Sequence, residues 1–218
     1  MEKEELLLIH GTEYKEMTKE ILYAAGLEAQ IGARDKKIGI KPNLVAPSEA
    51  FLGATTHPEI VAGIIEYLQE AGFQNIIMLE GSWVGDKTRE SMKVCGYEKL
   101  SEMYKVPFKD MQADPGELTE CGGMELEICR EAKSLDFLIN VPVMKGHCQT
   151  KITCALKNII FLILFLSCQP VIDNNIFYSQ RNGLEDLLLC CFIDCLTVKH
   201  LYVFFDRFFK LFFFEMTV

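Results

Sequence analysis

The run Leu135–Val143 constrains the fold more than any other segment of this chain of 218 residues. It is apolar at nearly every position, so both faces of an extended segment would be hydrophobic. Strands of this kind are typical of the centre of a parallel sheet, where helices cover both faces. The polar stretch Lys145–His147 comes almost directly after it. We therefore expect a buried central strand that is followed by a polar segment.

The segments before this run alternate between helical and extended patterns. Apolar residues at helical spacing predict helices over Tyr14–Ala29, Pro58–Ala71 and Thr88–Val94. Short apolar runs predict further strands, which are Lys37–Lys41, Asn75–Leu79, Tyr104–Phe108 and Glu125–Ile128. Strands separated by helices indicate βαβ units. The predicted fold class is therefore α/β, a mostly parallel open sheet with flanking helices, left incomplete because the α/β pattern stops after Asn158.

The composition changes abruptly near Asn158. Of the 15 glycines only Gly183 comes later, whereas 11 of the 15 phenylalanines do, and no alanine is found beyond this point. An α/β domain uses glycine in its turns and alanine in its helices. We expect residues 1–158 to form a partial α/β ligand-binding domain, and residues 159–218 to be an aberrant tail that is not its native continuation.

Three interpretations of this tail compete. A membrane span is excluded by length, because Ile159–Leu166 holds eight apolar residues where about 20 are needed. An interfacial helix over residues 201–214 is the second, since several apolar side chains would share one helical face. That face comprises Leu201, Phe204, Phe205, Phe208 and Phe212. The third, which we favour, is translated read-through or frameshifted sequence.

The net charge and the cysteine spacing disfavour several classes of function. The net charge of −9 disfavours nucleic-acid binding, which requires clustered Lys and Arg. The acidic start, Met1–Glu5, does not resemble a secretory signal, so we expect a cytoplasmic protein. In the cytoplasm the nine cysteines are expected to be reduced thiols. Their spacing matches neither a zinc site nor a ferredoxin cluster. We expect no metal site and no cofactor in this chain.

Three polar segments come directly after predicted strands. They are Lys41–Asn43, Glu80–Ser82 and Lys145–His147. Ligands of open parallel sheets bind beyond the carboxyl ends of the strands, so the three segments should meet at one edge. Their convergence predicts a polar site at that edge of the sheet.

The start of the helix at Pro58 has a structural and a functional interpretation. Thr56 and Glu59 have the spacing of a capping box, and Pro58 suits a first turn. Capping does not explain His57. Free N–H groups at a helix start favour an anion, so a phosphate or carboxylate ligand near His57 is physically reasonable.

Lys145 and His147 begin a second cluster. They precede several polar residues, which are Thr150, Lys151, Thr153, Lys157 and Asn158. A solvated loop would account for them. Basic residues concentrated in an otherwise acidic chain instead suggest a local anion site. Cys148 and Cys154 are expected to be inert small hydrophobes.

The candidate site thus has two groups of residues. The catalytic candidates are His57, Lys145 and His147. The ligand-binding candidates are Lys41, Asn43, Thr55, Thr56, Glu80, Ser82, Thr150, Thr153, Lys157 and Asn158.

The motifs in this order resemble a known family. They are Ile40–Val45, Ala54–Glu59, Glu80–Ser82, Gly96–Tyr97, Leu138–His147 and Thr153–Asn158. Over roughly residues 35–158 the chain is similar to the domain of unknown function family numbered 362. The resemblance implies that full-length relatives carry a ferredoxin-like module with two [4Fe–4S] clusters. Ile159–Phe161 departs from the glycine-bearing continuation of that family, and no ferredoxin cysteine run comes after it.

The leading hypothesis is a truncated relative of an iron–sulfur-associated oxidoreductase whose α/β domain binds a small anionic substrate. Lys41, Lys145 and Lys157 would hold the anion, and His57 or His147 would be the acid/base group or a metal ligand. Electrons would come from a ferredoxin-like donor. The alternatives are a non-enzymatic module that binds or senses the anion, and an inert fragment.

Overall fold

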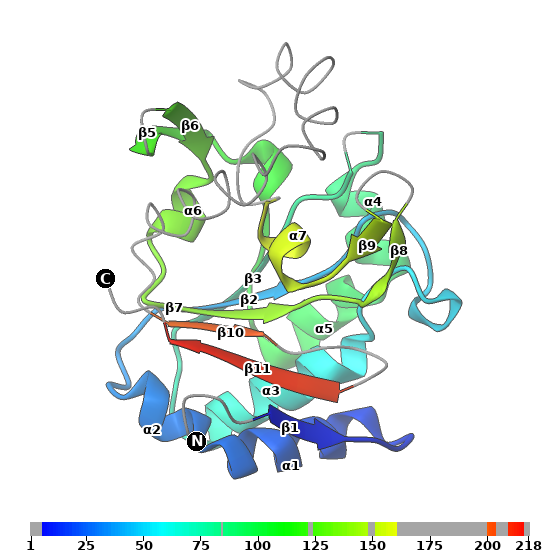
Figure 1. The fold of residues 1–218 in the computed structure, drawn as a ribbon, viewed down its shortest axis with the longest axis vertical. Coiled ribbons are helices and arrows are strands. Elements are labelled where there is room, and N and C mark those ends of the chain that lie inside the picture. Colours follow the sequence, from blue (N-terminus) through cyan, green and yellow to red (C-terminus); the bar gives the residue numbers. More distant parts are fainter. Residues whose placement is uncertain are drawn as a thin grey trace.

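The computed structural model describes residues 6–83, 85–121, 124–147, 151–160, 200–203 and 209–215. Its main feature is a seven-stranded sheet with the order β1-β11-β10-β7-β2-β3-β4 (Figure 1). Its strands are β1 (Leu6–Ile9), β2 (Ile38–Pro42), β3 (Ile76–Glu80), β4 (Phe108–Asp110), β7 (Phe137–Val141), β10 (His200–Val203) and β11 (Phe209–Glu215). The strands from β10 to β4 run parallel, and β11 is antiparallel to β10 and to β1. The predicted α/β class with a mostly parallel sheet is confirmed.

The predicted central strand is β7. It lies between β10 and β2, and all five of its residues are buried. Its odd-numbered residues belong to the core on one face of the sheet, and Leu138 belongs to the core on the other face. Because both faces are covered, the strand is apolar on both sides. The strand ends at Val141 because Pro142 has no N–H to donate to a neighbouring strand.

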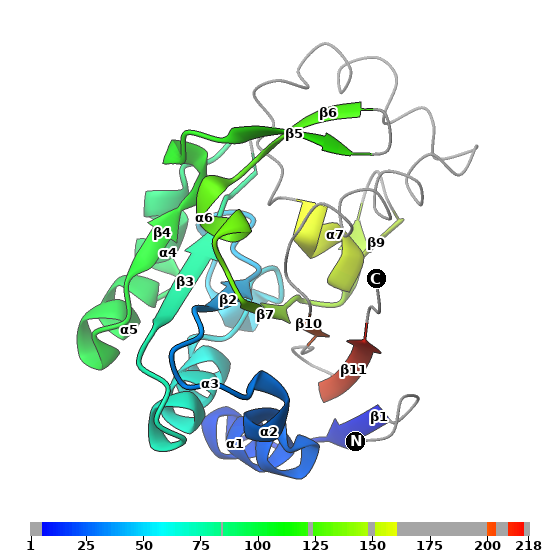
Figure 2. The same ribbon diagram turned by 90° about the vertical axis from the view of Figure 1, so that its left-hand side faces the viewer.

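One face of the sheet is covered by four helices (Figure 2). They are α1 (Tyr14–Ala25), α2 (Leu27–Ile31), α3 (Pro58–Glu70) and α5 (Tyr97–Tyr104). The single helix predicted over Tyr14–Ala29 is divided in two. Gly26 has a φ of 63°, a left-handed conformation that caps α1 and that glycine adopts without strain.

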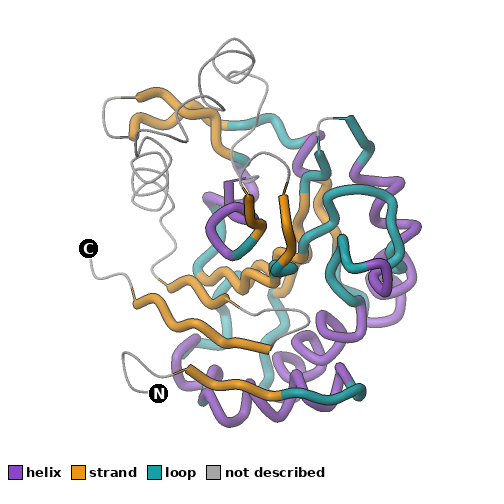
Figure 3. The backbone as a smooth tube through the Cα atoms, turned by 45° about the vertical axis from the view of Figure 1, so that its right-hand side comes forward, coloured by secondary structure: helices purple, strands orange, loops and turns teal. Residues whose placement is uncertain are grey.

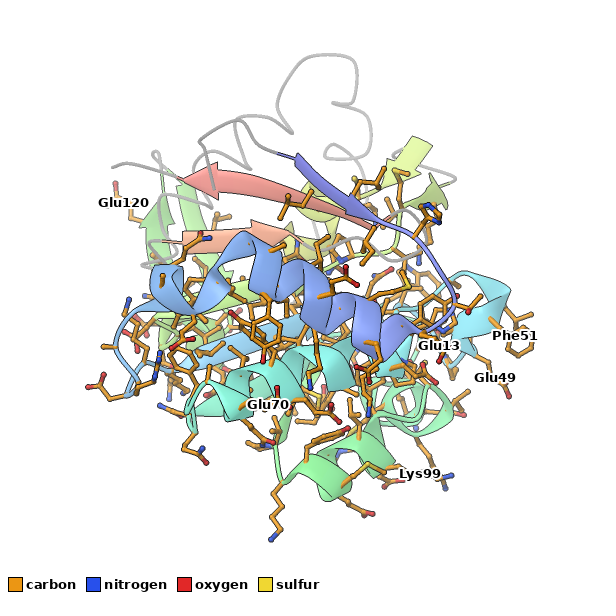
Figure 4. The ribbon with its side chains drawn as sticks, turned by 90° about the horizontal axis from the view of Figure 1, so that it is seen from below. Glu13, Glu49, Phe51, Glu70, Lys99 and Glu120 are labelled. Carbon is orange, nitrogen blue, oxygen red and sulfur yellow. The ribbon has the colours of Figure 1, made fainter. Side chains whose placement is uncertain are left out.

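Helices α1 and α3 pack closely through Gly63. A Cβ atom at this position would lie 2.6 Å from the Lys15 carbonyl oxygen and 2.8 Å from Thr18 Cβ. Ion pairs join the outer sides of the two helices, with Lys15 Nζ 3.0 Å from Glu66 and Lys19 Nζ 2.6 Å from Glu70. Figure 4 looks onto this layer, with Glu70 at the exposed end of α3.

The opposite face carries shorter elements (Figure 3). They are α6 (Arg130–Lys133), α7 (Ala155–Ile160), the hairpin of β5 (Glu117–Cys121) with β6 (Met124–Ile128), and the hairpin of β8 (Lys145–His147) with β9 (Lys151–Thr153). The remaining elements are α4 (Thr88–Val94), η1 (Ala50–Leu52) and η2 (Met111–Ala113). Leu138, Ile128 and Ile159 belong to the second, smaller core on this side. The sheet is therefore the middle of three layers.

One local prediction of a strand is wrong. Tyr104 ends helix α5 rather than opening a strand, and Lys105 leaves the helix with a φ of 55°. Only Phe108 of the predicted strand Tyr104–Phe108 enters the sheet, in β4. The predicted strand Glu125–Ile128 is confirmed within β6, which pairs with β5 in a separate hairpin. Lys145–His147, for which a solvated loop was one interpretation, is a strand of a second hairpin.

The tail contributes two strands to the sheet. Leu201, Tyr202 and Val203 pair with β7, and β11 continues the sheet to β1. Strands therefore occupy the described parts of the segment for which an interfacial helix was one interpretation, and residues 204–208 lie outside the described part. That residues 159–218 are not the native continuation stays a prediction. Among the described residues, no helix has the length and hydropathy needed to cross a membrane.

Candidate functional site

The site is built around a buried ion pair at the carboxyl ends of β2 and β3. Lys41 Nζ lies 2.8 and 2.9 Å from the two carboxylate oxygens of Glu80, and the side chains are 0% and 2% exposed. The same carboxylate accepts the backbone N–H groups of Gly81 at 2.9 Å and Leu44 at 3.3 Å. Burial raises the pKa of Glu80 and lowers that of Lys41, and each charge opposes the effect of burial on the other.

Three amide side chains, from the loop after β2, from α7 and from β7, extend from this pair as a chain of hydrogen bonds. Asn43 Nδ2 donates to Asn158 Oδ1 at 3.0 Å, and Lys41 Nζ donates to the same oxygen at 3.3 Å. Asn158 Nδ2 donates to Asn140 Oδ1 at 2.7 Å, and Asn140 Nδ2 donates to the Ala155 carbonyl at 2.9 Å. All three amides are buried. Since every nitrogen in this chain of bonds has an acceptor, the orientation of each amide is determined.

Lys145 is placed at the open end of the amide chain. Its Nζ donates to Asn43 Oδ1 at 2.8 Å and to the Ala54 carbonyl oxygen. The pKa of Lys145 is lowered to about 8, chiefly by burial and secondly by the nearby charge of Lys157, while the charge of Glu80 acts in the opposite direction. Among the described residues Lys145 forms no ion pair. Its cation therefore lies against two neutral oxygens, beside a second lysine.

Thr153 adds an unsatisfied hydroxyl next to this lysine. Thr153 in β9 is directly opposite Lys145 in β8, so both side chains leave the same face of the hairpin. The side chain is 2% exposed, and within the described part of the chain its Oγ1 has no hydrogen-bond partner. A buried hydroxyl without a partner is unfavourable by about 1–3 kcal/mol, so this position favours a further polar group.

Thr56 has a role different from the capping box predicted for it. The N-cap of α3 is His57, and no side chain caps the helix. The Thr56 hydroxyl instead accepts the Asn43 N–H at 2.8 Å and donates to the Val141 carbonyl at 2.7 Å. It therefore joins the ends of β2 and β7 beneath the site. The Thr55 hydroxyl donates to the Ser48 carbonyl at 2.7 Å and holds the preceding loop.

Two other predicted residues support neighbouring loops. The His57 ring lies 4.5 Å from the Tyr14 ring, centroid to centroid, and its Nδ1 lies 3.8 Å from Glu59, so these contacts connect it to α1 and to its own helix. The Ser82 hydroxyl donates to the Leu44 carbonyl at 2.6 Å and lies 2.8 Å from Ser91 Oγ. These bonds account for the burial of Ser82.

The remaining candidates are placed by their elements. Lys157 and Asn158 are in α7, whose first residue, Ala155, accepts the Asn140 amide. His147 is in β8, paired with Lys151, and its side chain lies outside the described part of the structure. Thr150 also lies outside it.

Asn140 and the carbonyl of Ala54 were not predicted from the sequence. Asn140 could have been identified from the sequence, because an amide inside an otherwise apolar buried strand requires hydrogen-bond partners. No feature of the sequence indicates Ala54, since it contributes a backbone oxygen whose position depends on how the loop before α3 folds.

The described residues do not fit the iron–sulfur clusters that the family resemblance implies. Among them, no group of three or more His, Cys, Asp or Glu is arranged to hold a metal ion. The described free cysteines Cys95, Cys129 and Cys154 have thiol pKa values raised chiefly by burial, to about 12 for Cys129. Burial of this kind disfavours the thiolate that binds iron. That the whole chain carries no cluster stays a prediction.

Solved structures share the fold. One is a protein of Thermotoga maritima with a TM-score of 0.58 and 13% sequence identity, covering 93% of this chain and 55% of that one. Another is the lactate racemase apoprotein of Thermoanaerobacterium thermosaccharolyticum, with a TM-score of 0.61 and 14% identity over 94% of this chain and 52% of that one. At this identity the likeness establishes the fold alone.

Sequence comparison establishes the family. A thylakoid-associated protein of Synechocystis sp. is 26% identical over 123 residues, which are 56% of this chain and 38% of that protein. The chain therefore matches little more than a third of that relative's length. The family model described as "Domain of unknown function (DUF362)" matches residues 38–166. That match includes β2, β7, the amide chain, Lys145 of β8 and Lys157 of α7, and the chain belongs to this family.

Proposed function

We propose that this domain binds a small anion of the carboxylate or phosphate class beside Lys145, Lys157 and Thr153. The observation that carries the proposal is the environment of Lys145. Its ammonium group is partly buried against two neutral oxygens, next to a second lysine. Like charges so close repel each other unless an anion offsets them.

The buried hydroxyl of Thr153 supports the same position. It lies across the hairpin from Lys145 and has no partner within the described residues, so a ligand oxygen would satisfy it. Ligands of this class of sheet also bind beyond the carboxyl ends of the strands, where these residues lie.

Lys41 has a supporting role in this proposal. The Glu80 carboxylate already balances its charge at 2.8 Å, and the pair is buried. Lys41 therefore positions Asn158, and through it Asn43, instead of holding the anion directly. His57 contacts Tyr14 and has no assigned part in binding.

Two functions are compatible with such a binding site, an oxidoreductase and a module that binds or senses the anion. A small hydroxy or oxo acid suits the site. One structural neighbour, lactate racemase, is named for a hydroxy acid. With a ferredoxin-like donor, as the family resemblance implies, the bound acid would be the substrate of an oxidoreductase. Without one, the domain would bind or sense the acid in the cytoplasm.

Titration calorimetry of the full chain with lactate and with phosphate, at low ionic strength, tests the binding. We expect saturable binding that weakens at least tenfold in Lys145→Met and in Lys157→Met. Lys99→Met is the matched control, because Lys99 is exposed on α5, away from the site (Figure 4). Equal affinity in all four proteins, or no heat of binding in the parent chain, would refute an anion site at Lys145.

A further inference from the structure

We propose that Lys145 Nζ forms an imine with the carbonyl carbon of a small 2-oxo carboxylate. This inference rests on the proposed function, since it requires an anion beside Lys145, and it adds both the substrate class and a covalent step.

The hydrogen bonds of Lys145 also suit the neutral amine that forms when the ammonium loses a proton. A neutral amine has two N–H donors and one lone pair, whereas an ammonium has three donors and no lone pair. The two observed acceptors, Asn43 Oδ1 and the Ala54 carbonyl, match the two donors of the neutral form. Asn43 cannot turn its nitrogen toward Lys145 without losing its bond to Asn158. The lone pair is then left for an electrophile.

Burial, and after it the charge of Lys157, increases the fraction of this neutral form near neutral pH. Lys157 disfavours the ammonium, Glu80 favours it, and the charge of Glu80 is opposed by Lys41 at 2.8 Å. Burial adds to the effect of Lys157, and the pKa of about 8 leaves a useful fraction of free amine. Desolvation and a neighbouring cation are the two means by which lysines become nucleophiles in proteins.

The neighbours of Lys145 specify the ligand. The Lys157 cation suits a carboxylate group, and the unpartnered Thr153 hydroxyl suits an oxygen on the carbon that Lys145 attacks. A carboxylate and a carbonyl on adjacent atoms together define a 2-oxo acid.

The step balances without an oxidant or reductant. The amine lone pair forms a C–N bond as the carbonyl π bond breaks, and one proton moves from nitrogen to the oxygen, giving a carbinolamine. The hydroxyl then leaves as water, taking a second proton, and a C=N bond forms. The products are one imine and one water molecule.

Trapping with sodium borohydride tests the inference. The full chain is incubated with pyruvate, reduced and analysed by peptide mass spectrometry. Reduction turns the imine into a stable secondary amine, so the modified peptide gains the mass of pyruvate less one oxygen. We expect this mass gain on Lys145 in the parent chain and in the Lys99→Arg control. In Lys145→Arg we expect no mass gain on the peptide that contains position 145. Labelling should increase as the pH rises through about 8.

Other outcomes are equally decisive. A label on Lys41, on Lys157 or spread over exposed lysines would overturn the assignment to Lys145, and so would no label at all. Site mapping in the parent chain does not depend on the folding of a variant. If the parent chain binds pyruvate by calorimetry but is not labelled, the imine alone is refuted. If the parent chain neither binds pyruvate nor is labelled, the anion site is refuted as well.

Discussion

Lys41 and Glu80 form an ion pair with 2.8 Å between nitrogen and oxygen, in which neither side chain is more than 2% exposed. Replacing either partner alone leaves a buried charge without its counterion, which is unfavourable by about 3–5 kcal/mol. We expect Glu80→Leu and Lys41→Met each to lower the free energy of unfolding by this amount in urea titrations. The double variant should recover part of the loss, and single variants as stable as the parent would contradict the pairing.

Thr56 should contribute to stability through its two hydrogen bonds. Thr56→Val keeps the volume but leaves the buried N–H of Asn43 and carbonyl of Val141 without their partner. We expect a loss of about 1–3 kcal/mol in the free energy of unfolding. Thr56→Ser retains the hydroxyl and is the matched control. Similar stability of the two variants would show that the bridge is unimportant.

Asn43→Asp should weaken anion binding at Lys145, and it also removes the hydrogen bond from Asn43 Nδ2 to Asn158. The new carboxylate would occupy the position of Asn43 Oδ1, 2.8 Å from Lys145 Nζ, and would pair with that ammonium. Opposite charge favours the ammonium, so the pKa of Lys145 should rise. We expect lactate affinity, measured by calorimetry, to fall at least tenfold. Unchanged affinity would place the anion elsewhere.

Lactate affinity should depend on pH through Lys145. Under the proposed function, lactate would bind the ammonium form of Lys145, whose pKa is about 8. Affinity should therefore be full below pH 8 and should fall as the pH rises through that value. Lys145→Arg stays charged across this range, so calorimetry between pH 6.5 and about 9.5 should show a decrease in the parent chain and none in the variant.

Gly63→Ala tests the contact between α1 and α3. The added Cβ would lie 2.6 Å from the Lys15 carbonyl, so the helices must separate. We expect a loss of about 1–3 kcal/mol from overpacking, which exceeds the gain in helix propensity of about 1 kcal/mol at most. At Gly81 a Cβ would meet nothing closer than 3.5 Å, so Gly81→Ala should have a smaller effect. A stabilised Gly63→Ala protein would contradict the close packing.

The local pattern of the sequence was enough to predict the elements. The apolar run around Phe137 is the central strand, the periodic segment from Pro58 is α3, and Thr88–Val94 is a helix with the predicted bounds. These signals depend on residues within a few positions of one another, which share one face or one strand. Because parallel strands end at a common edge, the sequence also placed Lys41 and Glu80 near each other.

The contacts within the site depended on tertiary structure. Asn43 and Asn158 are 115 positions apart, and Lys145 is 102 positions from the Asn43 oxygen that it contacts. Local capping patterns assigned Thr56 to a helix end, but its hydroxyl joins β2 to β7 because that fold brings Asn43 N–H and Val141 carbonyl within reach. Hydrogen bonds act over about 3 Å, so only the folded chain decides which distant polar groups meet.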